Sequence, residues 1–174
     1  MDTLTDDEVA AIRAADGWVK LDALTEAETE LDQLRPQARE HPDALQIRWL
    51  IASKRGDWPT CLRLAERLVA VEPSRRFGWL HLAESLHRLH RTEEAYDRLA
   101  AATEALDPSA TVPLQLARYA CRLGRLGEAR QWLRAAFTQA EESGHAERLR
   151  SRVRDDSDLA PLLATGSPGE PEPE

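Results

Sequence analysis

A small residue recurs every 34 positions along this chain, and this spacing constrains the fold more than any other feature. Aligning the sequence with itself at a shift of 34 gives four registers without gaps. The recurring small positions are Ala27, Cys61, Ala95 and Ala129. Apolar columns follow four and seven residues later, which is the spacing that places side chains on one face of a helix. The period therefore predicts repeated copies of one helical unit.

Each unit is predicted to contain two antiparallel helices joined by a tight turn. Ala, Leu, Arg and Glu are abundant and favour helix along most of the chain. One column of the repeat falls in the turn, and glycine there suits the left-handed backbone that often ends a helix. This turn column consists of Asp22, Gly56, His90 and Gly124.

Capping residues mark where the helices are expected to begin. Thr5 followed by Glu8, and Thr25 followed by Glu28, have the spacing of a capping box. The predicted N-caps of the second helices are Thr25, Asp57 and Thr92.

This pattern resembles the tetratricopeptide repeat family over roughly Asp6 to Glu142, with Pro73 closing the second unit. The resemblance implies an all-α fold, a right-handed α-α superhelix (a solenoid) of about four helix-turn-helix units plus a C-terminal capping helix. It implies a single domain over residues 6–163. The expected units are 8–41, 42–75, 76–109 and 110–143, with the cap over 144–163.

The C-terminal segment is expected to close the array. Ser143 and Gly144 end the last unit, and residues 145–154 predict an arginine-rich helix. The stretch "DDSDLAPLL" offers Asp156 or Ser157 as the N-cap of a short turn, with three apolar anchors, Leu159, Leu162 and Leu163. It is similar to the "DxDLxPL"-like ending of small bacterial tetratricopeptide proteins, where it looks like a plug for the last groove. Residues 165–174 are predicted to form a disordered acidic tail.

In tetratricopeptide arrays the first helix of each unit lines a concave groove and usually contacts the ligand. Carrying those positions across implies a partner-binding face of basic and apolar side chains, which suits a peptide or helix with acidic and apolar groups. Alternatively, the arginines are solvated and the apolar residues contact the C-terminal plug. The implied residues are Lys54, Phe77, Leu80, Glu84, His87, Arg88, Leu114, Arg118 and Arg122.

Composition excludes several classes of function. A net charge of −8 disfavours binding to nucleic acid, whose phosphates attract clustered positive charge. No apolar run approaches the ~18 residues that a membrane span needs. The two cysteines are too few for a disulfide framework, so we expect the protein to be located in the reducing cytoplasm. Arginine greatly outnumbers lysine, which suggests a GC-rich bacterial genome.

The sequence offers only weak candidates for a metal site or a catalytic site. His81, His87 and His90 lack a spaced set of further ligands, so no metal or other cofactor is expected. Cys121 could be a nucleophile beside Arg118 or Arg122, but no histidine stands at a helical neighbour position. We therefore predict a protein that is not an enzyme and has no catalytic residues.

The sequence thus predicts a non-catalytic protein–protein interaction module, acting as an adaptor, scaffold or chaperone-like subunit. The alternative is a structural subunit of a larger assembly whose groove is filled by its own C-terminal segment. We expect a monomer or a weak homodimer. A dimer would use an exposed Trp132 on the last unit, whereas the favoured interpretation is that Trp132 packs under the terminal helix.

Overall fold

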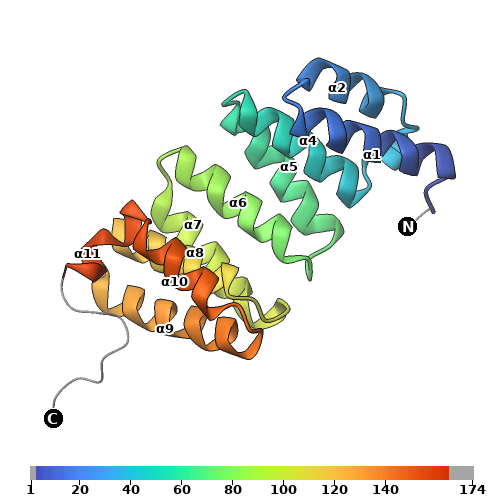
Figure 1. Cartoon of the computed structure of the whole chain (residues 1–174). Helices are drawn as coiled ribbons and strands as arrows, with labels where there is room; N and C mark the ends of the chain where they lie inside the picture. Colours follow the sequence, from blue (N-terminus) through green and yellow to red (C-terminus); the bar gives the residue numbers. More distant parts are fainter. Residues whose placement is uncertain (1–2, 165–174) are drawn as a thin grey trace, which may run out of the picture. The chain divides into compact units, whose positions relative to one another are not determined.

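The computed structural model describes residues 3–164, in which every regular element is a helix. The predicted tail over 165–174 lies outside the described residues. The predicted all-α fold of paired helices is confirmed (Figure 1). In chain order the elements are α1 (Asp6–Lys20), α2 (Leu24–Asp32), α3 (Pro36–Arg39), α4 (Pro42–Lys54), α5 (Trp58–Val71), α6 (Arg76–Arg88), α7 (Thr92–Ala102), η1 (Thr103–Ala105), α8 (Thr111–Arg122), α9 (Leu126–Glu142), α10 (Ala146–Arg154), η2 (Ser157–Leu159) and α11 (Ala160–Leu163).

The chain divides into two compact parts, each longer than one 34-residue repeat. From here on they are called the first unit (Met1–Leu89) and the second unit (His90–Glu174). In the first unit α1 packs on α2, α4 on α5, and α5 on α6, while α4 also contacts α1 and α2. In the second unit α7 and α9 pack on α8, and α10 and α11 contact α9. The predicted single domain over 6–163 stays a prediction.

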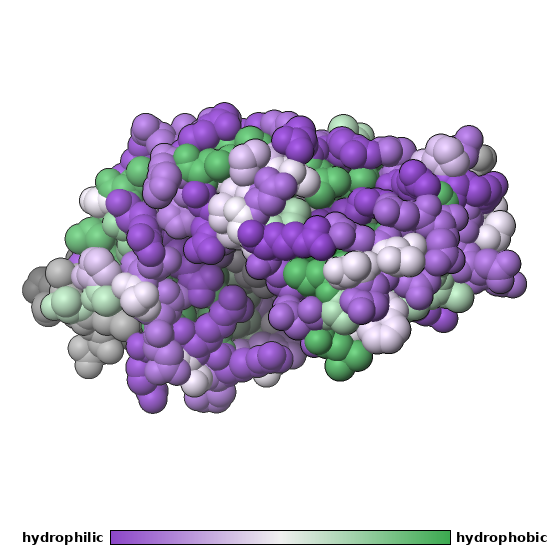
Figure 2. Space-filling view, turned by 90° about the horizontal axis from the view of Figure 1, so that it is seen from above, coloured by the Kyte–Doolittle hydropathy of each residue, from purple (hydrophilic) through white to green (hydrophobic). Residues whose placement is uncertain are grey.

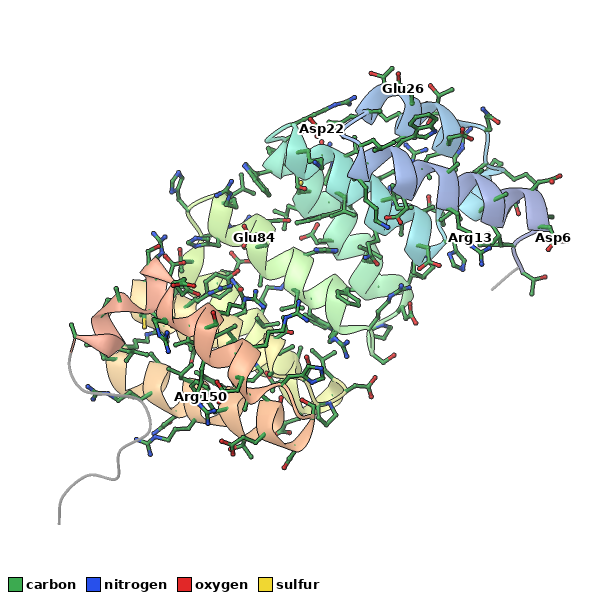
Figure 3. All side chains as sticks on the ribbon, viewed as in Figure 1. Asp6, Arg13, Asp22, Glu26, Glu84 and Arg150 are labelled. Carbon is green, nitrogen blue, oxygen red and sulfur yellow. The ribbon has the colours of Figure 1, made fainter. Side chains whose placement is uncertain are left out.

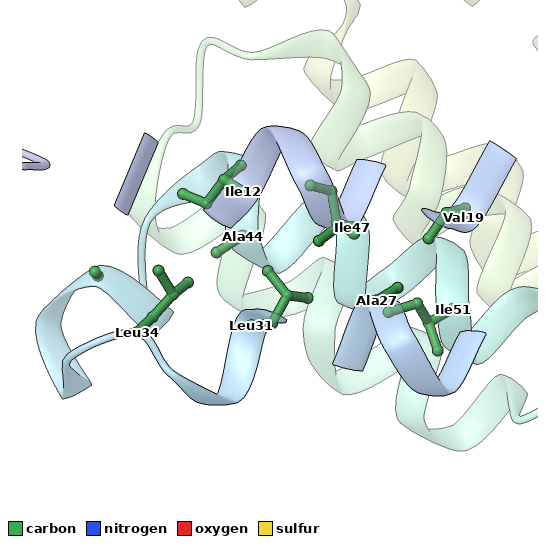
Figure 4. Packing of buried hydrophobic residues seen from close by; sticks show 10 residues of the cluster. Ile12, Val19, Ala27, Leu31, Leu34, Ala44, Ile47 and Ile51 are labelled. Carbon is green, nitrogen blue, oxygen red and sulfur yellow. The ribbon is translucent and has the colours of Figure 1, made fainter. Parts of the chain in front are cut away.

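A buried aliphatic cluster joins α1, α2, α3 and α4 of the first unit (Figure 4). It buries one face of each helix, which a single helix pair could not do alone. Its members are Ile12, Ala15, Val19, Ala27, Leu31, Leu34, Ala38, Ala44, Ile47 and Ile51.

The four positions of the turn column all adopt the left-handed backbone. This conformation is easy for glycine and tolerated by Asp and His better than by most residues. Asp22 marks the first of these turns, between α1 and α2 (Figure 3). The φ values are 62° at Asp22, 73° at Gly56, 63° at His90 and 73° at Gly124.

Two predicted caps are confirmed. The Oγ1 of Thr5 accepts a hydrogen bond from the Glu8 N–H at 3.3 Å, and the Thr5 N–H donates to Glu8 Oε2 at 2.9 Å. The Asp57 carboxylate accepts from the Thr60 N–H at 3.1 Å and caps α5. A capping box at the chain start and an N-cap on α5 were therefore readable from the sequence.

The predicted caps at Thr25 and Thr92 are wrong. The N-caps of α2 and α7 are Ala23 and Arg91, and neither supplies a side-chain hydrogen bond. The reason lies in the small column, because the N–H of each small residue donates to the carbonyl four residues earlier and so closes the first turn. These pairs are Ala27 with Ala23, Cys61 with Asp57, Ala95 with Arg91, and Ala129 with Arg125.

Glu8 also fastens α1 to the start of α3. The Nε and Nη2 of Arg35 donate to its two carboxylate oxygens at 2.7 and 2.8 Å. These bonds, together with the Thr5 N–H, hold the pKa of Glu8 at about 2.

In the first unit, the small column sets how closely α4 and α5 approach each other. All four of its residues, Ala27, Cys61, Ala95 and Ala129, are 0% exposed. On α5 the Sγ of Cys61 lies 3.7 Å from the carbonyl oxygen of Trp49 on α4. A larger side chain at this position would push the two backbones apart.

Enlarging this position is expected to destabilise the first unit. We predict that Cys61→Leu lowers the free energy of unfolding by about 2 kcal/mol through overpacking, whereas Cys61→Ala costs less than about 1 kcal/mol. The control is Ala70→Leu, on the exposed face of the same helix, which should change little. Urea denaturation followed by circular dichroism measures all three. Equal losses for Cys61→Leu and Ala70→Leu would contradict the close-approach explanation.

Candidate partner-binding site

In the first unit, α6 carries five of the residues that the sequence assigned to partner binding. Phe77 is 40% exposed, and the guanidinium carbon of Arg76 lies 5.2 Å above the centroid of its ring. Leu80, Glu84 and His87 are partly buried; Glu84 is visible on α6 in Figure 3. The helix therefore presents one large accessible apolar side chain near its N-terminus and charged groups near its C-terminus.

The basic residues of this first-unit face contact other residues of the same unit. The guanidinium of Arg88 lies 4.5 Å above the Trp58 ring, and its Nε is 3.9 Å from Glu84 Oε1. The Nζ of Lys54 lies 2.8 Å from Asp22 Oδ1. The Arg88 side chain is still 53% exposed, so it can accept a further partner.

In the second unit, the three predicted residues on α8 face a different environment. Leu114 is buried, and both arginines form ion pairs with the C-terminal segment. The Nε and Nη2 of Arg118 each lie 2.5 Å from Asp156 Oδ2. The Nη2 of Arg122 lies 2.6 Å from Asp158 Oδ1. An aspartate pair from the chain itself thus occupies the arginines expected to bind an acidic partner.

The rest of the C-terminal segment packs beside these ion pairs. Asp156 is the N-cap of η2, because its Oδ1 accepts from the Asp158 N–H at 3.0 Å. Leu159 and Leu162 are 0% and 1% exposed. Element η2 packs on α8, and α11 packs on α9. The predicted anchors Leu159 and Leu162 are therefore buried, while the side chain of Leu163 lies outside the described residues.

Sequence reasoning offered Asp156 as an N-cap and paired neither Asp156 nor Asp158 with an arginine. The available signal was a match of spacings. Arg118 and Arg122 stand one helical turn apart on α8, and Asp156 and Asp158 stand two residues apart in a turn. Such a match does not reveal which acidic pair in the chain reaches which arginines.

The cysteines have environments that do not suit a nucleophile. Burial, with the charges of Asp156 and Asp158, raises the pKa of the Cys121 thiol. Burial raises the pKa of Cys61 to about 11, with a smaller contribution from Asp57. Both thiols are therefore protonated at neutral pH, whereas thiol nucleophiles act as thiolates.

The histidines considered as metal ligands do not form a site. Within residues 3–164, no group of three or more His, Cys, Asp and Glu side chains is placed to hold a metal ion. His81 stacks on the buried ring of Trp49 with a centroid distance of 3.9 Å and an interplanar angle of 17°. Its role in the described structure is packing between α4 and α6.

A second group of charges lines a hollow between α2, α4 and α5 of the first unit. Three of its arginines are paired with carboxylates, and Arg39 donates to the backbone carbonyls of Leu34 and Asp32, so these charges connect neighbouring helices and have little capacity left for an anion. The pairs are Arg48 with Asp32, Arg55 with Glu28, and Arg67 with Glu40.

The visible surface is mostly hydrophilic, with apolar residues in small groups (Figure 2). Trp132, considered as a dimer contact, is partly buried and donates its indole N–H to the Tyr96 hydroxyl at 2.9 Å.

The described part of the chain was also compared with the requirements of a membrane span. None of its helices has both the length and the hydropathy to cross a bilayer.

Comparisons with solved structures identify the fold. No protein-family model and no curated protein matches the sequence. The structure of MamA MSR-1 aligns with a TM-score of 0.63 at 20% identity, covering 80% of this chain and 79% of the MamA chain. A double mutant of MamA RS-1 aligns at 0.66 and 15%, with coverage of 80% and 79%, and MamA AMB-1 at 0.57 and 20%, with 83% and 93%. MamA is a tetratricopeptide-repeat protein, and at these identities the likeness shows that this chain has a tetratricopeptide-like helical fold.

Proposed function

We propose that this chain is a non-catalytic protein–protein interaction module, an adaptor, scaffold or chaperone-like subunit that binds a peptide or helix on the first helices of its repeats. The observation that carries the proposal is the docking of Asp156 and Asp158 on Arg118 and Arg122. There α8 holds a short helical segment with two aspartates and leucine anchors, which is the ligand chemistry that the sequence implies.

The first unit supports the same function with a different surface. Phe77 supplies an accessible apolar contact, and Arg88 supplies an exposed guanidinium on the same helix. Aromatic and arginine side chains contribute disproportionately to protein interfaces. The free, buried cysteines and the arginine-rich composition favour a bacterial cytoplasmic protein.

The second candidate function is a structural subunit of a larger assembly. The same ion pairs favour it, because a first-helix face that is covered by its own C-terminal segment does not need a peptide ligand. In that case partners bind other surfaces of the protein and its α8 face stays closed.

The test is affinity capture from the native cell with quantitative mass spectrometry. Bait proteins are the wild type, the double variant Phe77→Asp with Arg88→Glu, and a matched control, Ala70→Asp with Arg63→Glu on the exposed face of α5. Both double variants change the charge equally. We expect the recovered amount of a specific partner to fall at least about tenfold with the α6 variant and to stay unchanged with the control. A tenfold fall corresponds to the loss of one hot-spot residue.

Two results would count against the interaction module. Equal recovery by all three baits would exclude the α6 face, and equal loss with both variants would indicate a general charge effect. A partner set retained at fixed stoichiometry by every variant would favour the assembly subunit. Thermal unfolding of each bait confirms that the surface changes leave the fold intact.

A further inference from the structure

The C-terminal segment, residues 155–164, combines an acidic pair with two buried leucines. We name the place where it lies the α8 seat: Arg118 and Arg122 with the adjoining surface of α8 and α9. The first ion pair is well shielded, because the Arg118 and Asp156 side chains are only 20% and 8% exposed. Charge-assisted hydrogen bonds of this kind are stronger than neutral ones. The seat therefore recognises a carboxylate at a defined position.

The pattern of burial along the segment indicates which of its residues the α8 seat recognises. Ser157 and Ala160 are exposed, whereas Asp156 and Asp158 pair with the two arginines and Leu159 and Leu162 are buried. Asp156 has a double role, since it binds Arg118 and also caps the turn that brings Asp158 toward Arg122. The recognised pattern is accordingly Asp-x-Asp-Leu-x-x-Leu, with the spacing set by the short helix.

Several features make this segment a replaceable occupant. Element η2 has three residues and α11 has four, which is too short for a helix that is stable alone. The second ion pair lies at the edge, with Arg122 52% and Asp158 25% exposed, and exposed pairs contribute little. Short elements open more readily than the long helices of a protein's core.

We propose that the α8 seat binds an Asp-x-Asp-Leu-x-x-Leu segment of a partner protein in place of the chain's own C-terminal segment, which acts as a built-in competitor. This inference rests on the proposed function for the existence of a protein partner, and it adds the chemistry of that partner. Because the competitor is tethered, its effective concentration is about millimolar, so the closed chain binds partners more weakly than the open one.

The test uses a fluorescent peptide of sequence DDSDLAPLLA, which is residues 155–164. The full chain is prepared as wild type and with Asp156→Lys and Asp158→Lys, which repel the resident segment from the arginines. Fluorescence anisotropy should show binding to the opened variant at least about tenfold tighter than to the wild type. A control peptide with asparagine at the two aspartate positions should bind at least about tenfold more weakly, because it lacks both charge pairs.

Further variants keep the test decisive. Adding Arg118→Glu to the opened variant should abolish binding. If the opened variant does not fold, Leu159→Ala with Leu162→Ala releases the same segment without a change of charge. Hydrogen exchange over residues 155–164 verifies the release.

A released segment without peptide binding would overturn the proposal. A wild-type dimer that the peptide dissociates would overturn it as well, because the occupant would then be a second copy. These measurements use purified components on α8 of the second unit, so their failure is distinct from failure of the capture experiment, which alters α6 of the first unit.

Discussion

Replacing Trp49 with alanine is expected to lower the free energy of unfolding of the first unit by about 4 kcal/mol. Trp49 is 6% exposed and connects three elements. Its ring stacks on His81 of α6 and meets the Trp58 ring of α5 edge-on, with centroids 6.5 Å apart. Truncation would leave a large cavity and remove both aromatic contacts.

The indole N–H of Trp49 adds a polar reason for the large effect. It donates to the Ser85 hydroxyl at 3.0 Å, and that hydroxyl donates to the His81 carbonyl at 2.7 Å. Ser85 is 0% exposed, so alanine at position 49 would leave its oxygen buried with one partner fewer. A buried polar atom that loses its partner costs a further 1–3 kcal/mol or so.

The measurement is urea denaturation monitored by circular dichroism, because fluorescence changes when a tryptophan is removed. Trp18→Ala is the matched control, since Trp18 belongs to the same unit and is 37% exposed. Its loss should cost less than about half as much. Similar shifts of the unfolding midpoint for the two variants would contradict the central position of Trp49.

The repeat period predicted the helices well because it reports burial directly. Residues of the small column are fully buried, and the turn column is left-handed even where Asp22 and His90 replace glycine. Both features recur in each 34-residue repeat, so the sequence contains four examples of each. The helix starts at Thr25 and Thr92 were misplaced because a capping residue is a local signal, whereas the observed starts follow the small column.

Contacts that occur once were not predictable in the same way. The stack of His81 on Trp49 joins residues on α4 and α6, and periodicity identifies the buried face of a helix but not the rotamer that fills it. The pairs of Arg118 and Arg122 with the C-terminal segment join residues 38 and 36 positions apart. The sequence indicated arginines that suit an acidic ligand, and the structure supplies one from the same chain.

Acidification is expected to weaken the first unit through His81. Burial, with a smaller effect of the nearby Arg75 charge, lowers the pKa of His81 to about 4 from 6.5. Its Nε2 is buried and, within the described residues, has no hydrogen-bond partner. A proton bound there in the folded state would place a charge in an apolar site against the Trp49 ring and near a guanidinium.

The direction of the pH effect follows from proton linkage. The unfolded chain binds a proton at His81 below about pH 6.5, whereas the folded chain resists it down to about pH 4. Stability from this group is therefore complete above pH 6.5 and declines as the pH falls toward 4, by roughly 3 kcal/mol in total. Carboxylates titrate over part of the same range, so only a comparison with a variant isolates the histidine.

His81→Phe supplies that comparison, because phenylalanine keeps a ring beside Trp49 and cannot bind a proton. Its unfolding free energy should lie within about 1 kcal/mol of the wild type at pH 7, since the two rings have similar volume. Between pH 6.5 and 4 the unfolding free energy of the wild type should fall more steeply with decreasing pH than that of the variant. The difference in slope is at most that expected when the unfolded state binds one more proton than the folded state. Parallel profiles, or a folded-state NMR titration of His81 near pH 6.5, would show that the ring is not shielded from water. Because Trp49→Ala removes the stacking partner, it should also raise the folded-state pKa of His81 and flatten the same profile, provided that the protein still folds.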